Sequence, residues 1–178
     1  MASILIQDAC VLINLLGSGR FRDIAAGCGL EFAIVSAVST ETLYLHNPDP
    51  SEREQIDLQP LINDGILKIL DPENEQEKLR YIELALSLDD GEAESVAIAE
   101  SRNYALATDD KKARRRMQNE NIKIELWSTC SLLQSWQKKS SVSDEDMKNA
   151  LKNILSRARY HPKAGHPNYD WWMALISK

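Results

Sequence analysis

The sequence predicts an α/β protein built as a parallel-sheet αβα sandwich, with helices on both faces of the sheet. Short runs of β-branched and apolar residues alternate with longer segments of helical spacing from residue 3 to about residue 138. This alternation is typical of βαβ units, whose strands pair in parallel. A chain of 178 residues, 43% of them hydrophobic and 27% charged, is long enough and apolar enough for one full hydrophobic core.

The strands and helices are assigned in order along the chain. Strands are expected at 3–8, 31–38, 66–71, 104–108 and 122–126. Helices are expected at 9–19, 39–46, 51–65, 74–88, 89–103, 109–121 and 128–139. Ser39 or Thr40 can cap the second helix, which would place Glu41 in its first turn. Apolar residues form a broad stripe along the fourth helix: Leu79, Ile82, Leu84, Ala85, Leu86 and Leu88.

A polar stretch at 138–146, KKSSVSDED, follows the alternating part. Beyond it, apolar spacing predicts an amphipathic helix around Met147, Leu151, Ile154, Leu155 and Ala158. The tail from 159 to 178 is aromatic and irregular in pattern. We therefore expect one α/β domain at 1–139 and a C-terminal helical extension at 140–178.

The composition excludes several classes of protein. No apolar run approaches the roughly 20 residues that would span a bilayer. The apolar N-terminus is interrupted by Asp8 and has no basic residue before it, which argues against a signal peptide. The three cysteines, Cys10, Cys28 and Cys130, form no C-x-x-C pair. We therefore expect reduced thiols in a cytoplasmic protein that has no membrane partner.

The net charge is −6, from 21 basic and 27 acidic residues. A simple nucleic-acid-binding protein is usually basic, so this balance counts mildly against such a partner. A local basic patch can still act within an acidic protein, and a cluster of metal-binding carboxylates would itself make the net charge negative.

Acidic residues recur where the predicted strands end and the next helices begin. They are Asp8, Glu41, Glu92, Glu94, Asp109 and Asp110. In an open parallel sheet, ligands bind outside the carboxyl ends of the strands. Carboxylates that meet there repel one another unless a cation lies between them. Mg²⁺ prefers oxygen ligands, and bound Mg²⁺ or Mn²⁺ can orient water for phosphodiester cleavage.

Other chemistries lack their motifs. The chain contains no G-x-x-x-x-G-K-[ST] and no G-x-G-x-x-G segment for phosphate binding. Of the three histidines, His46, His161 and His166, none is near a serine at a strand end. No His and Cys spacing suggests zinc. An Asp-x-Asp motif would favour a phosphatase, but the sequence here is Asp8-Ala9-Cys10.

Four segments, in order, resemble the motifs of PIN-domain nucleases. They are ILIQDACVLINLL, VSTETL, the GEAE helix, and the Asp-Asp-x-x-x-Arg segment that follows residue 108. The resemblance covers about residues 3–135 and is closest to the branch near the toxin nucleases of type II toxin–antitoxin pairs. It implies a metal-dependent ribonuclease with Asp8, Glu41, Glu92 and Asp110 as catalytic metal ligands. Glu94 and Asp109 are the alternatives to Glu92 and Asp110.

Each candidate residue also has a purely structural interpretation. Acids in the first turn of a helix stabilise its positive end by roughly 0.3–1 kcal/mol, and either Asp109 or Asp110 can cap the next helix. The basic residues Lys111, Lys112, Arg114 and Arg115 are either phosphate contacts or a solvated helix face. Asn14 is either a substrate contact or a buried structural amide.

The leading hypothesis is an endoribonuclease that needs Mg²⁺ or Mn²⁺, with RNA as its substrate. An antitoxin and a second copy of the chain are further expected partners. The alternative hypothesis is a module that has the same fold, binds RNA or protein, and has lost catalysis.

Overall fold

The computed structural model describes residues 3–41, 43–47 and 52–177, which form two compact units. The first unit comprises Met1–Val11, Leu30–Glu41 and Asp57–Ser128. The second comprises Leu12–Gly29, Thr42–Ile56 and Thr129–Lys178. Residues 140–178, predicted as a separate extension, thus lie in the second unit together with segments from the N-terminal part of the chain.

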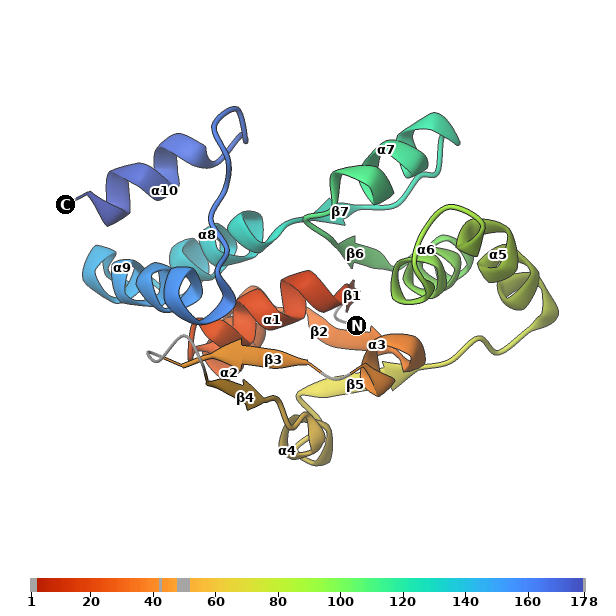
Figure 1. Ribbon diagram of the computed structural model, residues 1–178, viewed down its shortest axis with the longest axis horizontal. Coiled ribbons are helices and arrows are strands. Elements are labelled where there is room, and N and C mark those ends of the chain that lie inside the picture. Colours follow the sequence, from red (N-terminus) through yellow and green to blue (C-terminus); the bar gives the residue numbers. More distant parts are fainter. Residues whose placement is uncertain (1–2, 42, 48–51, 178) are drawn as a thin grey trace. The chain divides into compact units, whose positions relative to one another are not determined.

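The first unit contains a five-stranded sheet in which every neighbouring pair of strands is parallel (Figure 1). Its strands are β1 (Ile4–Gln7), β2 (Glu31–Val35), β5 (Leu67–Leu70), β6 (Ala105–Ala107) and β7 (Leu126–Trp127). Their order is β5-β2-β1-β6-β7. The predicted α/β class with a parallel sheet is confirmed. The last strand, β7, overlaps the predicted range 122–126 only at Leu126.

The middle of this sheet is buried, as the apolar runs of the sequence require. Ile6 of β1 lies opposite Ala33 of β2 and Leu106 of β6, and all three are at most 1% exposed. Parallel strands are usually covered on both faces, which explains why their sequences show continuous apolar runs instead of alternation.

The order of the strands defines where a ligand can bind. From β1 the chain moves outward to β2 and β5, and then returns to place β6 on the other side of β1. In open α/β sheets, such a reversal leaves a crevice beyond the carboxyl ends of the two strands that flank it. Asp8 follows β1 directly. After β6 the chain continues with Thr108, Asp109 and Asp110, in that order.

Helices of the first unit position the remaining acids. They are α3 (Ser36–Thr40), α4 (Gln59–Asn63), α5 (Glu75–Ala85), α6 (Asp90–Arg102) and α7 (Lys111–Asn119). Helix α6 contacts β1, β2 and β6, and α5 packs alongside α6 (Figure 1). A buried ion pair joins α5 to α6: Arg102 donates to Glu77 with Nε and Nη2, each at 2.8 Å.

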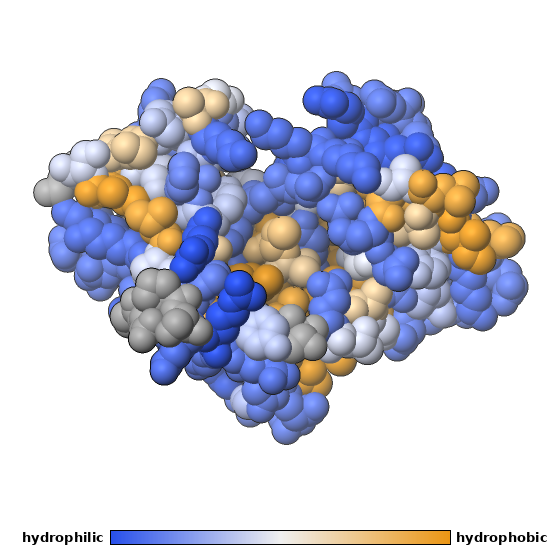
Figure 2. Space-filling model, in the orientation of Figure 1, coloured by the Kyte–Doolittle hydropathy of each residue, from blue (hydrophilic) through white to orange (hydrophobic). Residues whose placement is uncertain are grey.

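The apolar stripe predicted along 74–88 is only partly buried. Leu84 and Leu88 belong to the core, but Leu79, Ile82 and Leu86 are 60%, 59% and 87% exposed. Figure 2 shows apolar surface at the right of the view, where Figure 1 places α5. Only part of the stripe therefore belongs to the core, and α5 packs on α6.

The second unit consists of helices and one small hairpin. Its helices are α2 (Phe21–Cys28), α8 (Thr129–Lys139), α9 (Asp144–Asn153), the π-helical turn η1 (Ile154–Ala158) and α10 (Tyr169–Ile176), and most of α1 (Ala9–Gly17) also belongs to it. The hairpin pairs β3 (Tyr44–His46) with β4 (Arg53–Gln55) in antiparallel fashion.

Three sequence predictions are corrected in these regions. The helix expected at 39–46 is replaced by the end of α3 and by β3, and the helix expected at 51–65 is reduced to α4 because 53–55 form β4. Residues 42 and 51 of these two predicted helices lie outside the described residues. Helix α2 was not predicted, and the tail at 159–178, expected to be irregular, contains α10. No helix in the described ranges is both long enough and apolar enough to cross a membrane.

Candidate active site at the carboxyl edge of the sheet

Asp8 is a buried carboxylate at the point where β1 ends and α1 begins. Its side chain is 4% exposed, and its Oδ1 accepts the backbone N–H of Val11 at 2.7 Å. Its own N–H donates to the carbonyl of Ala107 on β6, so the parallel pairing of β1 and β6 fixes its position. An acid held this way at a strand end is costly to ionise unless an opposite charge is near.

Burial raises the pKa of Asp8 from its ordinary value of 3.8 to about 7. Hydrogen bonds from Thr108 and Val11 act in the opposite direction, and the charges of Asp109 and Glu92 add to the increase. Asp8 therefore takes up a proton more readily than an ordinary carboxylate, mainly because burial disfavours its charged form.

Thr108 connects Asp8 to the acids that follow β6. Its hydroxyl accepts the N–H of Asp110 at 3.0 Å and hydrogen-bonds the side chain of Asp8. Asp110 is the N-cap of α7, because its Oδ1 accepts the N–H groups of Lys112 and Ala113 at 2.6 and 2.8 Å. Of Asp109 and Asp110, either of which could cap this helix, it is therefore Asp110 that does so. Its carboxylate lies at the positive end of α7.

Glu92 lies in the first turn of α6, whose N-cap is Asp89. Burial raises the pKa of Glu92 from 4.5 to about 7, and the charges of Asp89 and Asp110 contribute in the same direction. Asp8, Glu92 and Thr108 line one narrow space, together with Ser95, Val96, Leu106 and Ala113, and this space has no room for a water molecule. In the part of the chain that the structure describes, the fully buried hydroxyl of Ser95 has no hydrogen-bond partner.

Glu41 reaches the same end of α6 from a different element. It is the C-cap of α3, not a first-turn residue of a following helix as the sequence suggested. Its Oε1 would lie 3.0 Å from a Cβ added at Gly91, so the glycine leaves room for this carboxylate beside the start of α6. Burial raises the pKa of Glu41, and the charges of Asp89 and Asp90 raise it further.

Glu94, the alternative to Glu92, has a structural partner. Its side chain is 7% exposed, and its Oε2 accepts the N–H of Ala37 at 2.8 Å, at the N-terminal end of α3. Glu94 therefore anchors the short helix that ends at Glu41. Burial raises its pKa, while the bond from Ala37 lowers it. This arrangement favours Glu92 over Glu94 as the residue that faces the other acids.

The chemistry of these side chains fits a hard divalent cation, since they supply carboxylate oxygens that repel one another without it. Across the described ranges, however, no group of three or more His, Cys, Asp or Glu side chains is arranged to hold a metal ion. A bound ion would thus require Asp8, Glu92 and their neighbours to draw closer, which the ion favours by removing their repulsion.

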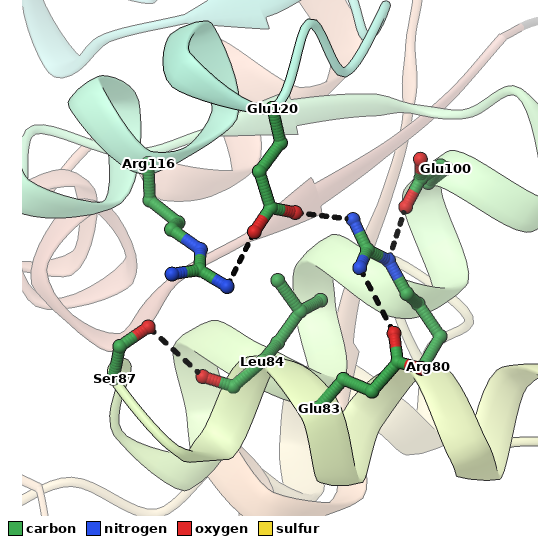
Figure 3. A network of polar contacts seen from close by, with 7 residues as sticks. All are labelled: Arg80, Glu83, Leu84, Ser87, Glu100, Arg116 and Glu120. Atoms are coloured by element: carbon green, nitrogen blue, oxygen red, sulfur yellow. Dashed lines mark hydrogen bonds and ion pairs between the residues drawn. The ribbon is translucent and has the colours of Figure 1, made fainter.

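The basic residues of α7 fall into two kinds. Lys111, Lys112 and Arg115 are exposed, and the charge of Lys112 lowers the pKa of Glu92. Arg114 instead donates to backbone carbonyls at the ends of β6 and β7. Arg116 pairs with Glu120, which also accepts from Arg80 at 2.6 Å (Figure 3).

Figure 3 shows that Arg80 lies between three carboxylates, Glu83, Glu100 and Glu120. This network ties α5 and α6 to the residue that ends α7. Arg116 therefore has a structural role. The exposed cations of α7, Lys111, Lys112 and Arg115, all come before Arg116 and so lie nearer to Asp110 along the helix.

Asn14, predicted as a substrate contact, is a buried amide in the second unit. It is 4% exposed, and its Nδ2 donates to Thr129 Oγ1 at 3.0 Å. This contact agrees with the interpretation of Asn14 as a buried structural amide.

Three residues of this site, Thr108, Gly91 and Ser95, have no predicted role in the sequence. For Thr108 the signal was present, because a hydroxyl two residues before an acid can accept that residue's N–H. Asp89 is the N-cap of α6. Gly91 and Ser95 lie close to the acids only because distant segments pack together, which no local pattern reveals.

The fold and the site together define an α/β protein with an acidic site at the topological switch point of a parallel sheet. A PIN-domain family model, DUF3368, matches residues 4–165, and the chain belongs to this family of PIN domains. No curated protein and no solved structure matches the chain. The resemblance to the PIN family is thus confirmed, and PIN domains are generally nucleases that use divalent metals.

Proposed function

We propose that this protein is an endoribonuclease that hydrolyses RNA phosphodiester bonds with the help of Mg²⁺ or Mn²⁺. The observation that carries the proposal is Asp8, a carboxylate 4% exposed at the switch point of the sheet with a pKa raised to about 7. A buried acid in this state is destabilising by itself, and perturbed groups of this kind gather at functional sites.

Asp8, Glu92, Glu41 and the pair Asp109–Asp110 would hold the ion. When bound, the ion lowers the pKa of a water ligand and stabilises charge on the phosphate. The chain's own contribution is to fix the acids: Thr108 orients Asp8, the N-terminus of α7 holds Asp110, and Glu94 anchors the helix that ends at Glu41.

The RNA strand would contact the exposed cations at the start of α7. Lys111, Lys112 and Arg115 lie one to five residues after Asp110, so a phosphate bound to them is near the acids along the chain. Cation–phosphate contacts supply affinity without sequence specificity, and such affinity falls as salt rises. We further propose that the enzyme acts as the toxin of a type II pair, held inactive by an antitoxin, and that it works as a homodimer.

The test is cleavage of a labelled single-stranded RNA by the purified protein. Cleavage should require added Mg²⁺ or Mn²⁺, stop with EDTA, and be lost in Asp8→Asn, while Glu92→Gln should lower it by at least tenfold. Cleavage that continues unchanged in EDTA would overturn the proposal. For the toxin role, induced expression should arrest growth of the host cell, and Asp8→Asn should abolish the arrest.

One observation favours a second candidate, a PIN-fold module that binds RNA or protein without turnover. Among the described residues no group of three potential ligands is preassembled for an ion. Such a module would retain salt-dependent RNA binding in a filter assay and show no cleavage with any divalent metal. Mn²⁺ binding measured by electron paramagnetic resonance separates the two candidates, because only the nuclease needs it.

A further inference from the structure

Arg114, predicted from sequence as a phosphate contact, is directed toward the backbone of the site. Its Nε donates to the carbonyl of Thr108 at 2.8 Å, and its Nη2 donates to the same carbonyl at 2.6 Å. Nη2 also donates to the carbonyl of Trp127. These two carbonyls lie at the carboxyl ends of β6 and β7, where Thr108 N–H itself bonds Trp127 O at 3.1 Å.

These bonds close a loop of contacts around the acids. From Thr108 the chain passes Asp109 to Asp110, which begins α7 with its side chain and accepts Arg114 N–H with its carbonyl at 3.2 Å. One turn into that helix, the Arg114 side chain returns to Thr108. The turn that carries Asp109 and Asp110 is thus fixed at both ends by the same arginine.

The hydroxyl of Thr108 transmits this constraint to Asp8. Because the hydroxyl hydrogen-bonds Asp8 and accepts Asp110 N–H, a shift of the Thr108 backbone displaces both acids together. A planar guanidinium can contact two carbonyls at once, whereas an ammonium offers a single point of charge.

We infer that Arg114 is a positioning residue: it clamps the ends of β6 and β7 so that Asp8, Asp109 and Asp110 are held together for the metal ion, and it does not bind RNA. The part of this inference that concerns the metal ion rests on the proposed function, whereas the part that concerns the contacts of Arg114 with the strand ends does not. Residues that orient metal ligands from behind typically change metal affinity or activity by 10- to 100-fold when they are removed.

The test compares Arg114→Gln and Arg114→Lys with Arg115→Gln, an exposed neighbour on the same helix. We expect Arg114→Gln to weaken Mn²⁺ binding to the RNA-free protein about tenfold or more and to lower kcat with little change in KM. Arg114→Lys should have a Mn²⁺ affinity and a kcat between those of the wild type and of Arg114→Gln, since it keeps the positive charge but not the planar guanidinium. Arg115→Gln should raise KM and reduce the salt dependence of RNA binding, with Mn²⁺ affinity unchanged.

Amide hydrogen exchange gives a readout that needs neither metal nor RNA. In Arg114→Gln, the N–H groups of Asp110, Lys112 and Ala113 should exchange faster than in the wild type, and in Arg115→Gln they should not. Faster exchange in a protein that binds no Mn²⁺ would support the clamp and reject the proposed function. If Arg114→Gln raises KM as Arg115→Gln does, with unchanged exchange and Mn²⁺ affinity, Arg114 is an RNA contact and the inference is overturned.

Discussion

Replacing Asp8 by asparagine should abolish cleavage and yet make the metal-free protein more stable at pH 8. The amide is nearly isosteric with the carboxylate, and its oxygen can still accept the N–H of Val11, now at 2.7 Å from Asp8 Oδ1. What the substitution removes is a buried negative charge. Activity and stability should therefore change in opposite directions, as they do where a site is strained for its function.

The magnitude follows from the pKa of Asp8, about 7 in the folded protein against an ordinary value of 3.8. Below pH 4 the group is protonated in both states and costs nothing. Between pH 4 and 7 only the unfolded chain has lost the proton, so stability falls by about 1.36 kcal/mol per pH unit. Above pH 7 the full cost is present, on the order of 4 kcal/mol.

Urea unfolding at pH 5, 6.5 and 8, in the presence of EDTA, measures this directly. The stability gain of Asp8→Asn over the wild type should be largest at pH 8 and shrink steadily as the pH falls toward 4. Asp23→Asn is the matched control, since Asp23 is exposed and meets Arg20 only at the surface. Equal stabilities of the wild type and Asp8→Asn at pH 8 would refute the reasoning, because the carboxylate would then carry no desolvation cost.

Three further changes test the surroundings of the site. Gly91→Ala should destabilise the protein by about 1–3 kcal/mol in urea unfolding and weaken Mn²⁺ binding, because the new methyl meets side-chain atoms at 2.9 and 3.0 Å; unchanged values would contradict this. Glu77→Gln should cost about 3 kcal/mol, because Arg102 loses the charge of a partner that is 1% exposed, and an unchanged melting temperature would exclude it. Burial and nearby acids raise the pKa of the Cys10 thiol to about 12, so Asp109→Asn should speed its alkylation by iodoacetamide, and an equal rate would disprove that coupling.

The parallel sheet was predictable because its signals are local. Each strand that forms it is a short apolar run, and burial on both faces leaves that run uninterrupted in the sequence. Asp8, Asp109 and Asp110 were predictable for the same reason, since each follows such a run within three residues of its end. The rule that ligands bind beyond the carboxyl ends of parallel strands then places them at one edge.

The hairpin of β3 and β4 was not predicted, because both strands fall within segments whose apolar spacing indicated helices. The alternation of buried Leu43, exposed Tyr44 and buried Leu45 is a strand signal, but three residues are too few to outweigh neighbouring helical spacing. Misplacing this element also misplaced Glu41, which ends a helix and does not begin one.

The roles of Glu92 and Glu94 could not be separated from sequence, because both lie at the start of the same helix. Only the approach of α3 distinguishes them: it brings the N–H of Ala37 to Glu94, whereas Glu92 interacts with Asp110, which follows β6. The same limit applies to Arg114, whose neighbours in the sequence are exposed cations. Its carbonyl partners belong to two strand ends that meet only in the folded sheet.

The acids at this edge differ in how they are compensated, and the difference predicts how metal affinity depends on pH. Asp89 and Asp110 accept N–H groups at the positive ends of α6 and α7. Asp8 and Glu92 have pKa values of about 7, so an ion that binds them below pH 7 must displace protons. Mn²⁺ affinity should therefore rise between tenfold and a hundredfold per pH unit from pH 5 to 6.5 and level off above pH 7.5. Titration calorimetry of the RNA-free protein across this range measures it, with Asp8→Asn, which has one proton fewer to displace, as the comparison. An affinity that does not change with pH would mean that the ion binds elsewhere.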